Sequence, residues 1–167
     1  IWLDSEIGHQ GDYQWKMIKA GDATDPGEKI SLSNYTTANW MPAIVPGTVL
    51  NSLVYNQKYP EPYYGINNKI ESKLIPDISE TGRDFYTYWF RTDFTVPQSF
   101  KGKTVWLQLD GINYRAEVWV NGNLLSTMNG MFIQDYIDVT DFVKIGGKNG
   151  LAIKVYPVDV PGSAKPK

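Results

Sequence analysis

The feature that most constrains the fold of this chain is the stretch 103–125, which reads KTVWLQLDGINYRAEVWVNGNLL. Its apolar residues stand at alternate positions in two runs: Val105, Leu107 and Leu109, then Ala116, Val118 and Val120. Successive side chains of a strand point to opposite faces of a sheet, so this period of two predicts two half-buried β-strands. Asn121 and Gly122 supply the positive φ angles that a tight turn requires. We therefore predict a β-hairpin that begins near Ala116 and returns through Leu124.

Strand signals recur along the rest of the chain. Residues 85–96 (FYTYWFRTDFTV) are bulky on both faces, which predicts a long central strand. Residues 131–137 and 151–156 predict two further strands, and the segment around Trp15 and Met17 predicts a short one near the start. Strands therefore predominate in the predicted structure.

Helix signals are few and short. Thr48 is a suitable N-cap, and apolar residues follow it at helical spacing over 49–54. Apolar residues at intervals of four over 66–74 predict a second short helix that ends before Pro76. The other predicted segments are a single helical turn at 138–143 capped by Asp138, and loops at 21–27 and 59–65. Many strands with one or two short helices favour an all-β chain, an antiparallel β-sandwich of jelly-roll type.

Size and charge exclude several classes of protein. A chain of 167 residues predicts one domain, and 42% hydrophobic residues are enough to fill a core. Its 16 basic and 18 acidic residues give a net charge of −2, which offers no electrostatic reason to bind nucleic acid or an anionic membrane. No apolar run is long enough to span a membrane, since about 18 residues are needed. The chain begins with Ile1 rather than Met, which fits a processed protein or a piece of a longer parent; a secreted or periplasmic location is favoured.

The residues that usually carry catalysis or hold metals are scarce. The absence of cysteine excludes disulfides and thiolate metal sites, and the single histidine, His9, has no second imidazole to share a metal with. A Ser-His-Asp triad around His9 is formally possible, but a surface histidine is the simpler interpretation. The acidic residues at 22–28 lack the spacing of a calcium loop, and no phosphate-binding glycine motif occurs. We therefore expect no metal and no cofactor.

A glycosidase needs two positioned carboxyl groups. Of the six glutamates, only Glu117 lies on a predicted strand, and no carboxylate flanks it, so a salt bridge is the simpler role for it. Aromatic rings can also stack on sugars, and the best candidates are Trp40, Tyr63 and Tyr64, because they lie near prolines in predicted loops. Core packing is the alternative for all of them. Trp106 and Trp119, on predicted strands, are expected to be structural, packed against loops or helices of this domain or against another domain.

Five segments of the sequence resemble a known family. They are WMPAIVPGTVLNSL, YPEPYYGINN, YTYWFRTDF, LDGINYRAEVWVNG and DVTDFVKIGGKNGLAIKVYP, and they occur in this order between residues 40 and 157. Together they resemble the N-terminal domain of family 2 glycoside hydrolases, which include β-galactosidases, β-glucuronidases, β-mannosidases and exo-β-glucosaminidases. The wording of the fourth segment is most similar to the exo-β-glucosaminidase and β-mannosidase branch.

The resemblance implies a galactose-binding-domain-like jelly roll whose catalytic glutamates lie in a (β/α)8 barrel elsewhere in a parent chain. This domain would buttress that barrel, and the parent would act on a β-linked oligosaccharide or glycoside. The family closes the domain with a further strand after the position of Val160, and no matching motif is present here. We therefore expect a sandwich over 1–160 that lacks its final strand, a linker-like tail at 161–167, and an exposed sheet edge that permits self-association.

The resemblance also suggests a position for a sugar contact. In the family, the loop before the strand that matches YWFRTDF approaches the sugar subsite of the barrel. The corresponding residues here are Arg83, Asp84 and Tyr86, with Tyr88 following, and Asp84 is the first choice because a carboxylate accepts two hydroxyl hydrogen bonds. A simple turn at the strand entrance is the alternative role of Arg83 and Asp84. An independent carbohydrate-binding or adhesion module is the competing function, because a fold does not fix a function.

Overall fold

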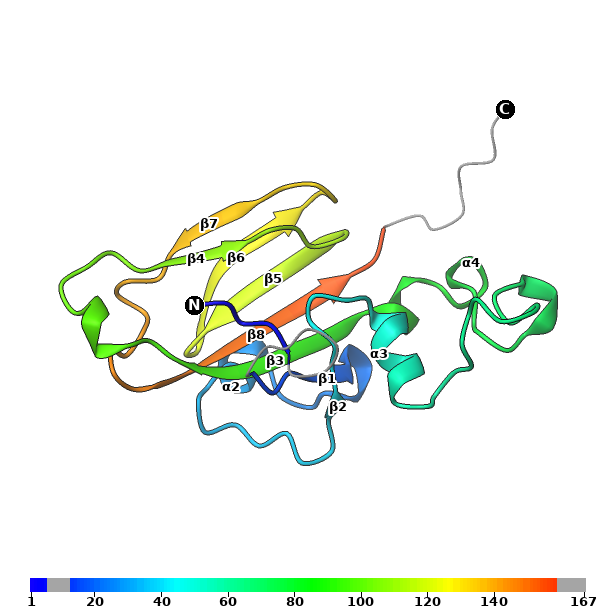
Figure 1. Ribbon diagram of the computed structural model, residues 1–167, viewed down its shortest axis with the longest axis horizontal. Helices are drawn as coiled ribbons and strands as arrows, with labels where there is room; N and C mark the ends of the chain where they lie inside the picture. Colours follow the sequence, from blue (N-terminus) through cyan, green and yellow to red (C-terminus); the bar gives the residue numbers. More distant parts are fainter. Residues whose placement is uncertain (6–12, 159–167) are drawn as a thin grey trace.

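The protein, described here by a computed structural model over residues 1–5 and 13–158, is built from two antiparallel sheets that face each other (Figure 1). The strands are β1 (Lys16–Lys19), β2 (Met41–Pro42), β3 (Tyr88–Thr95), β4 (Trp106–Leu109), β5 (Arg115–Val120), β6 (Asn123–Asn129), β7 (Asp135–Asp138) and β8 (Lys148–Tyr156). The α-helices are α2 (Gly27–Ile30), α3 (Val49–Tyr55) and α4 (Ile78–Thr81), and the 3-10 helices are η1 (Ala20–Asp22), η2 (Ile70–Ser72), η3 (Arg83–Tyr86) and η4 (Gln98–Phe100). Within the described ranges, no helix is long and apolar enough to cross a membrane.

The larger sheet has six strands in the order β2-β1-β3-β8-β5-β6, and the smaller pairs β4 with β7. The predicted β-sandwich is therefore confirmed. β3 lies inside the sheet between β1 and β8, and pairs with β8 along its whole length from Tyr88↔Val155 to Thr95↔Lys148. Its central place follows from its bulk on both faces, because each face of β3 is covered by a different layer.

The main core fills the space between the sheets. Fully buried side chains such as Met17, Val118 and Leu151 come from the larger sheet, and buried Ile137 comes from β7 of the smaller one, with Val105 from just before β4. α3 adds Leu53 to the same core. The helix begins as predicted, because the Thr48 hydroxyl accepts a hydrogen bond of 2.9 Å from the Asn51 amide.

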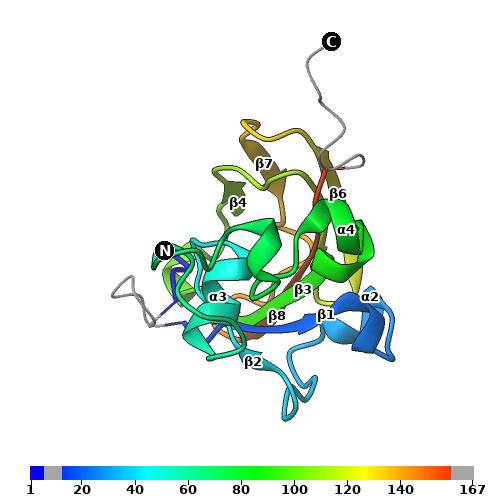
Figure 2. The ribbon, with the colours of Figure 1, turned by 90° about the vertical axis from the view of Figure 1, so that its right-hand side faces the viewer.

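A second cluster covers the other face of the larger sheet. Ile30, Trp40, Trp89 and Ala152 are its buried members, and Trp119 packs against them from β5. α2, which the sequence analysis did not predict, supplies Ile30 and lies on the side of the larger sheet away from β4 and β7 (Figure 2). Trp119 thus packs within the domain as expected. Trp106 is 58% exposed, so it does not pack against loops or helices in the described part of the domain, and its packing against another domain stays a prediction.

The predicted hairpin is confirmed: β5 and β6 are antiparallel neighbours joined at Asn121 and Gly122, with φ angles of 48° and 92°. The Asn121 side-chain nitrogen donates to the Asn149 side-chain oxygen at 2.7 Å. The Asn121 side-chain oxygen accepts from the Gly150 backbone amide at 2.9 Å. The Gly122 amide donates to the Ser31 hydroxyl at 2.9 Å. The turn is therefore fastened both to the start of β8 and to the end of α2.

Three sequence-based boundaries were wrong. The helix predicted over 66–74 is only the three-residue η2, because its apolar residues find no surface of this domain to pack on and Ile66, Ile70 and Leu74 stay about half exposed. The strand predicted over 85–96 starts at Tyr88, since residues 83–86 coil into η3. The strand predicted over 131–137 is shortened to β7, because Gly130 has a φ of 142° and turns the chain.

Candidate functional site

One end of the sandwich, where β3 begins and β8 ends, collects most of the predicted site residues. η3 contacts β8 there. The Tyr114 amide donates to the Tyr156 carbonyl at 3.0 Å, and the Gly130 amide donates to the Tyr114 carbonyl at 2.9 Å. We call this row, formed by η3, Tyr114, Gly130 and Tyr156, the η3 rim.

η3 presents a carboxylate at the η3 rim. Gly82, with a φ of 78°, ends α4 and turns the chain into η3, and the Thr87 hydroxyl donates to the Arg83 carbonyl at 3.0 Å. The Asp84 side chain is exposed and makes no hydrogen bond or ion pair with any residue that the structure describes. Its oxygens can therefore accept hydrogen bonds from a ligand without first breaking an internal contact.

Three tyrosines, Tyr59, Tyr86 and Tyr88, lie close to one another at η3 and the start of β3. Burial raises the pKa of Tyr86 to about 12, with further contributions from Tyr59, Tyr88 and Asp77. Burial, followed by Tyr59 and Asp22, also raises the pKa of Tyr88. The Tyr86 hydroxyl donates to the Pro76 carbonyl, which ties η3 to the segment before α4. These hydroxyls stay protonated at neutral pH, and that of Tyr86 is already engaged as a donor to Pro76.

Glu117 belongs to the outer face of the larger sheet beside the η3 rim. It accepts hydrogen bonds from the Tyr156 hydroxyl and from the Trp119 indole nitrogen, the latter at 3.3 Å. Burial raises the pKa of the Tyr156 hydroxyl, and its hydrogen bond to Glu117 and the Glu117 charge raise it further, against the opposing charges of Arg115 and Arg83. These contacts give Glu117 a structural role, although its partners are a tyrosine and a tryptophan rather than the salt bridge expected.

An arm, residues 57–82, extends from the same end of the molecule (Figures 1 and 2). Contacts between residues close in sequence hold it together, such as the Lys73–Glu80 ion pair at 2.6 Å and the Asn67 amide donating to the Glu61 carbonyl at 2.8 Å. Five of its large apolar side chains stay exposed: Tyr63 92%, Tyr64 77%, Ile66 54%, Leu74 48% and Ile70 47%. Single exposed apolar side chains are ordinary, but five on one segment mark a surface suited to a partner.

The structure places the predicted site residues in three environments. It brings Arg83, Asp84 and Tyr86 together on η3, and it places Tyr64 on the exposed arm. Trp40 instead lies in the second cluster, 7% exposed and edge-to-face with Tyr35 at 6.0 Å. A ring covered to that extent has no face left for a sugar, so its position between loops was a misleading signal. His9 and the tail from residue 159 lie outside the described residues.

Sequence reasoning missed the loop at 131–133, which follows the η3 rim at Gly130. Its side chains are exposed: Phe132 91%, Ile133 49% and Met131 42%. The glycine before this apolar run was the available signal, because glycine marks a place where a strand pattern is interrupted. Among the residues described, no group of three or more His, Asp or Glu side chains is placed to hold a metal ion.

Comparisons with known proteins agree with the β-sandwich fold described above. The family model described as glycosyl hydrolase 2 galactose-binding domain-like matches residues 15–164. A mannosylglycoprotein endo-β-mannosidase of Lilium longiflorum is 43% identical over 132 residues, which are 79% of this chain and 13% of the relative. An exo-β-D-glucosaminidase of Amycolatopsis orientalis is 29% identical over 86% of this chain and 13% of its own length. The chain thus spans about one eighth of these curated relatives.

Solved structures show the same fold. The exo-chitosanase of Amycolatopsis orientalis superimposes with a TM-score of 0.72 at 28% identity, covering 89% of this chain and 16% of that protein. A β-D-mannosidase of Dictyoglomus thermophilum superimposes with a TM-score of 0.66 at 22% identity, over 93% of this chain and 15% of the other. The predicted relation to the exo-β-glucosaminidase and β-mannosidase branch is confirmed by these relatives.

Proposed function

This chain belongs to the galactose-binding-domain-like family of glycosyl hydrolase 2 proteins, and from that premise we propose that it is a non-catalytic domain of a β-glycosidase. Its role is to buttress the catalytic barrel of the parent enzyme and to line one side of the sugar subsite. The substrate is a β-linked glycoside or oligosaccharide, since the relatives are named for β-mannosides and β-glucosaminides. The domain comprises residues 1–160, and residues 161–167 lead to the rest of the parent.

The observation that carries this proposal is the concentration of exposed apolar groups beside the η3 rim. The arm displays Tyr63 and Tyr64, and the loop after Gly130 displays Phe132, while the sandwich behind them keeps an ordinary buried core. Protein interfaces are rich in aromatic residues at their centres. Docking of this end against a barrel would cover these side chains.

The polar part of the η3 rim suits a sugar. Asp84 offers carboxylate oxygens to hydroxyl groups, Arg83 offers a cation beside it, and the Tyr86 oxygen, whose proton is donated to the Pro76 carbonyl, can accept a hydrogen bond. Tyr64 on the arm offers an aromatic ring for the apolar face of a sugar ring. This domain supplies recognition, and the acid and nucleophile of glycoside cleavage come from the barrel.

The test is Asp84→Ala in a full-length enzyme that contains this domain, assayed on aryl β-glycosides of mannose and glucosamine. We expect kcat/KM to fall by an amount worth about 1–3 kcal/mol, the cost of leaving a polar partner unpaired, at unchanged thermal stability. Asp141→Ala is the matched control, because Asp141 is an exposed carboxylate beside Phe142, whose carbonyl accepts from the Asn121 side chain at the β5–β6 turn and not at the η3 rim. Unchanged kinetics for Asp84→Ala would remove the subsite role and leave a buttressing role only.

The isolated chain separates this proposal from an independent carbohydrate-binding module. We expect it to hydrolyse none of the aryl β-glycosides of glucosamine, mannose, galactose and glucuronic acid. Turnover that survives repurification and disappears in Glu117→Gln would contradict a non-catalytic domain. Tight binding of an oligosaccharide by the isolated chain, unaffected by Asp84→Ala, would instead favour a binding or adhesion module.

A further inference from the structure

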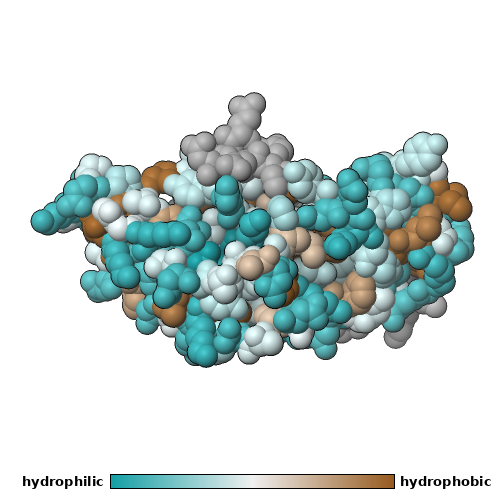
Figure 3. Space-filling model, turned by 90° about the horizontal axis from the view of Figure 1, so that it is seen from below, coloured by the Kyte–Doolittle hydropathy of each residue, from teal (hydrophilic) through white to brown (hydrophobic). Residues whose placement is uncertain are grey.

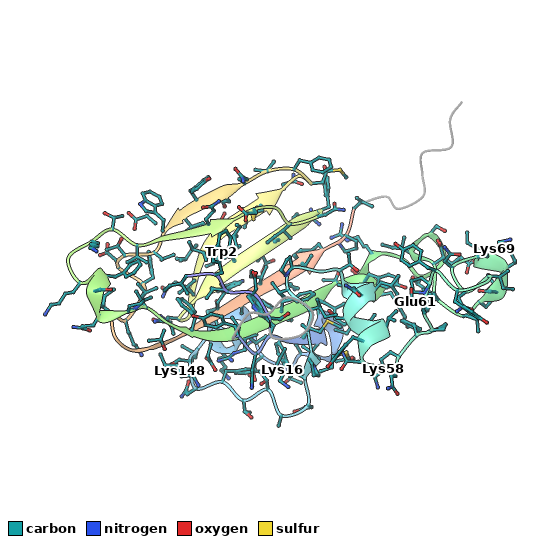
Figure 4. All side chains as sticks on the ribbon, viewed as in Figure 1. Trp2, Lys16, Lys58, Glu61, Lys69 and Lys148 are labelled. Atoms are coloured by element: carbon teal, nitrogen blue, oxygen red, sulfur yellow. The ribbon has the colours of Figure 1, made fainter. Side chains whose placement is uncertain are left out.

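A polar hollow lies away from the η3 rim, on the outer face of the larger sheet. It encloses about 510 Å³, within the range of small-ligand sites, and opens to solvent. Gln14, Lys16, Thr37, Arg91, Asp93 and Lys148 are among its lining residues. Figure 4 shows Lys16 and Lys148 on the lower side of the ribbon, and Figure 3 shows that hydrophilic side chains predominate on that underside.

The strand register places like charges side by side in this hollow. Lys16 on β1 is paired directly with Arg91 on β3, so both side chains leave the same face of the sheet. Like charges directly opposite each other on neighbouring strands are destabilising unless an anion compensates them. Lys16 makes no ion pair with any residue in the described part of the chain.

The described lining of the hollow has three cationic side chains and one carboxylate. Asp93 accepts from Arg91 Nη2 at 2.6 Å and from Lys148 Nζ at 3.1 Å, and it is the one acidic residue in the hollow's described lining. The hollow therefore keeps a surplus of positive charge after its internal pairs are formed.

Hydrogen bonds hold the Arg91 side chain in place but involve only two of its three guanidinium nitrogens. Its Nε donates to the Ile30 carbonyl at 3.1 Å and its Nη2 to the Leu32 carbonyl at 2.8 Å, which fixes the side chain at 4% exposure. Its Nη1 has no hydrogen-bond partner among the described residues, while every fully buried side-chain nitrogen there has one. Nη1 is therefore not fully buried, and because Arg91 lines the hollow, this one nitrogen is left to donate its two N–H groups to an anion there.

We propose that this hollow binds the oxyanion group of a small soluble ligand, a carboxylate or a tetrahedral sulfate or phosphate. Arg91 Nη1 supplies fixed donors at the base, and Lys16 and Lys148 close over the anion from two sides. The Thr37 and Gln14 side chains line the same hollow and are available to the rest of the ligand. This site is separate from the proposed sugar subsite and does not depend on it.

Titration calorimetry on the 167-residue chain at low salt tests the proposal with inorganic sulfate, D-glucuronate and D-glucose. We expect saturable binding of sulfate, glucuronate or both, and none of glucose, because glucose has the ring without the charge. Sulfate alone would identify a tetrahedral anion, and glucuronate alone a carboxylate. Lys16→Gln and Lys148→Gln should each weaken binding about tenfold, the effect of losing one charge-assisted hydrogen bond.

Lys58→Gln and Lys69→Gln are the matched controls, since both lysines are exposed and lie toward the other end of the molecule (Figure 4). Both should bind like the unmodified chain. The proposal is overturned if neither anion binds saturably, if glucose binds as well as glucuronate, or if the control variants lose as much affinity as the variants in the hollow.

Discussion

Many large apolar side chains are buried in the sandwich, whereas five stay exposed in the arm. In the sandwich, Val118 and Leu151 sit on neighbouring strands and are almost fully buried, held by pairing between segments far apart in sequence. In the arm, Ile66 and Leu74 are about half exposed, and contacts between near neighbours such as Lys73 and Glu80 hold the backbone. Stability therefore resides in the sandwich, while the arm keeps its apolar surface available for another partner.

The largest expected effect contrasts one leucine from each region. Leu151→Ala removes a side chain that is 1% exposed and should lower the free energy of unfolding by about 2–5 kcal/mol. Leu74→Ala, at 48% exposure, should change it by less than about 0.5 kcal/mol. Urea denaturation of the two variants measures both values. Equal losses would show that the arm is part of the cooperative core.

Gly150 and Gly21 differ in the space around them, and replacing each with alanine compares tight with open packing. A Cβ on Gly150 would stand 2.2 Å from the Ser31 carbonyl oxygen, so Gly150→Ala must push the backbone of the covering segment away, at a cost of about 1–3 kcal/mol. Gly21→Ala is the control, because nothing lies within 4 Å of its added Cβ. Thermal unfolding should separate the two variants clearly. A Gly150 variant as stable as the control would mean that the segment over β8 yields freely.

High pH should weaken the contact between the arm and the sandwich at Tyr86. The pKa of Tyr86 is raised from 10.0 to about 12 in the folded protein, so its contribution to stability is complete below about pH 10 and is lost as pH rises toward 12. Its hydroxyl donates to the Pro76 carbonyl, so ionisation should release the arm. Protease sensitivity of the arm should increase over this window in the unmodified chain. Tyr86→Phe should be more sensitive at neutral pH and respond less to rising pH.

The smallest effect concerns the edges of the larger sheet. One edge, β2, has two residues and a proline, whereas the other, β6, reads NLLSTMN without a charge. Uncharged edges permit strands of two molecules to pair, and a lysine suppresses this. We expect light scattering to detect weak self-association that Thr127→Lys reduces and Thr81→Lys, on α4, does not. A chain that is monomeric at every concentration would contradict this prediction.

The regular part of this fold could be predicted because its cause is local. Alternation over 105–109 and 116–120 predicted β4 and β5, the Asn121-Gly122 pair predicted the turn from β5 to β6, and the bulk of 85–96 on both faces predicted a central position. The helix expected over 66–74 failed because its apolar spacing implied a surface to pack on, and this domain supplies none. The prediction that Trp40 is exposed for sugar stacking was wrong for the opposite reason. α2, a short element without a strong helix pattern, supplies Ile30 to the cluster that buries Trp40.

The candidate site was predictable only in part. η3 could be located because the resemblance to a family pointed to the loop before the central strand. Tyr59 and Tyr156 could not be found, since their proximity to η3 depends on where distant segments meet. The paired charges of Lys16 and Arg91 were hidden for the same reason, because strand register joins two residues far apart in the sequence.

The hairpin turn also determines how this protein ages chemically. In a flexible chain, an asparagine followed by glycine deamidates readily, because the glycine amide nitrogen attacks the asparagine side-chain carbonyl. Here both reacting groups are engaged: the Gly122 amide donates to Ser31, and the Asn121 oxygen accepts from Gly150. Deamidation at Asn121 should therefore be slow while the turn is folded and rapid once it opens. The acidic product accumulated in a stored sample would record the total time that its hairpin has spent open.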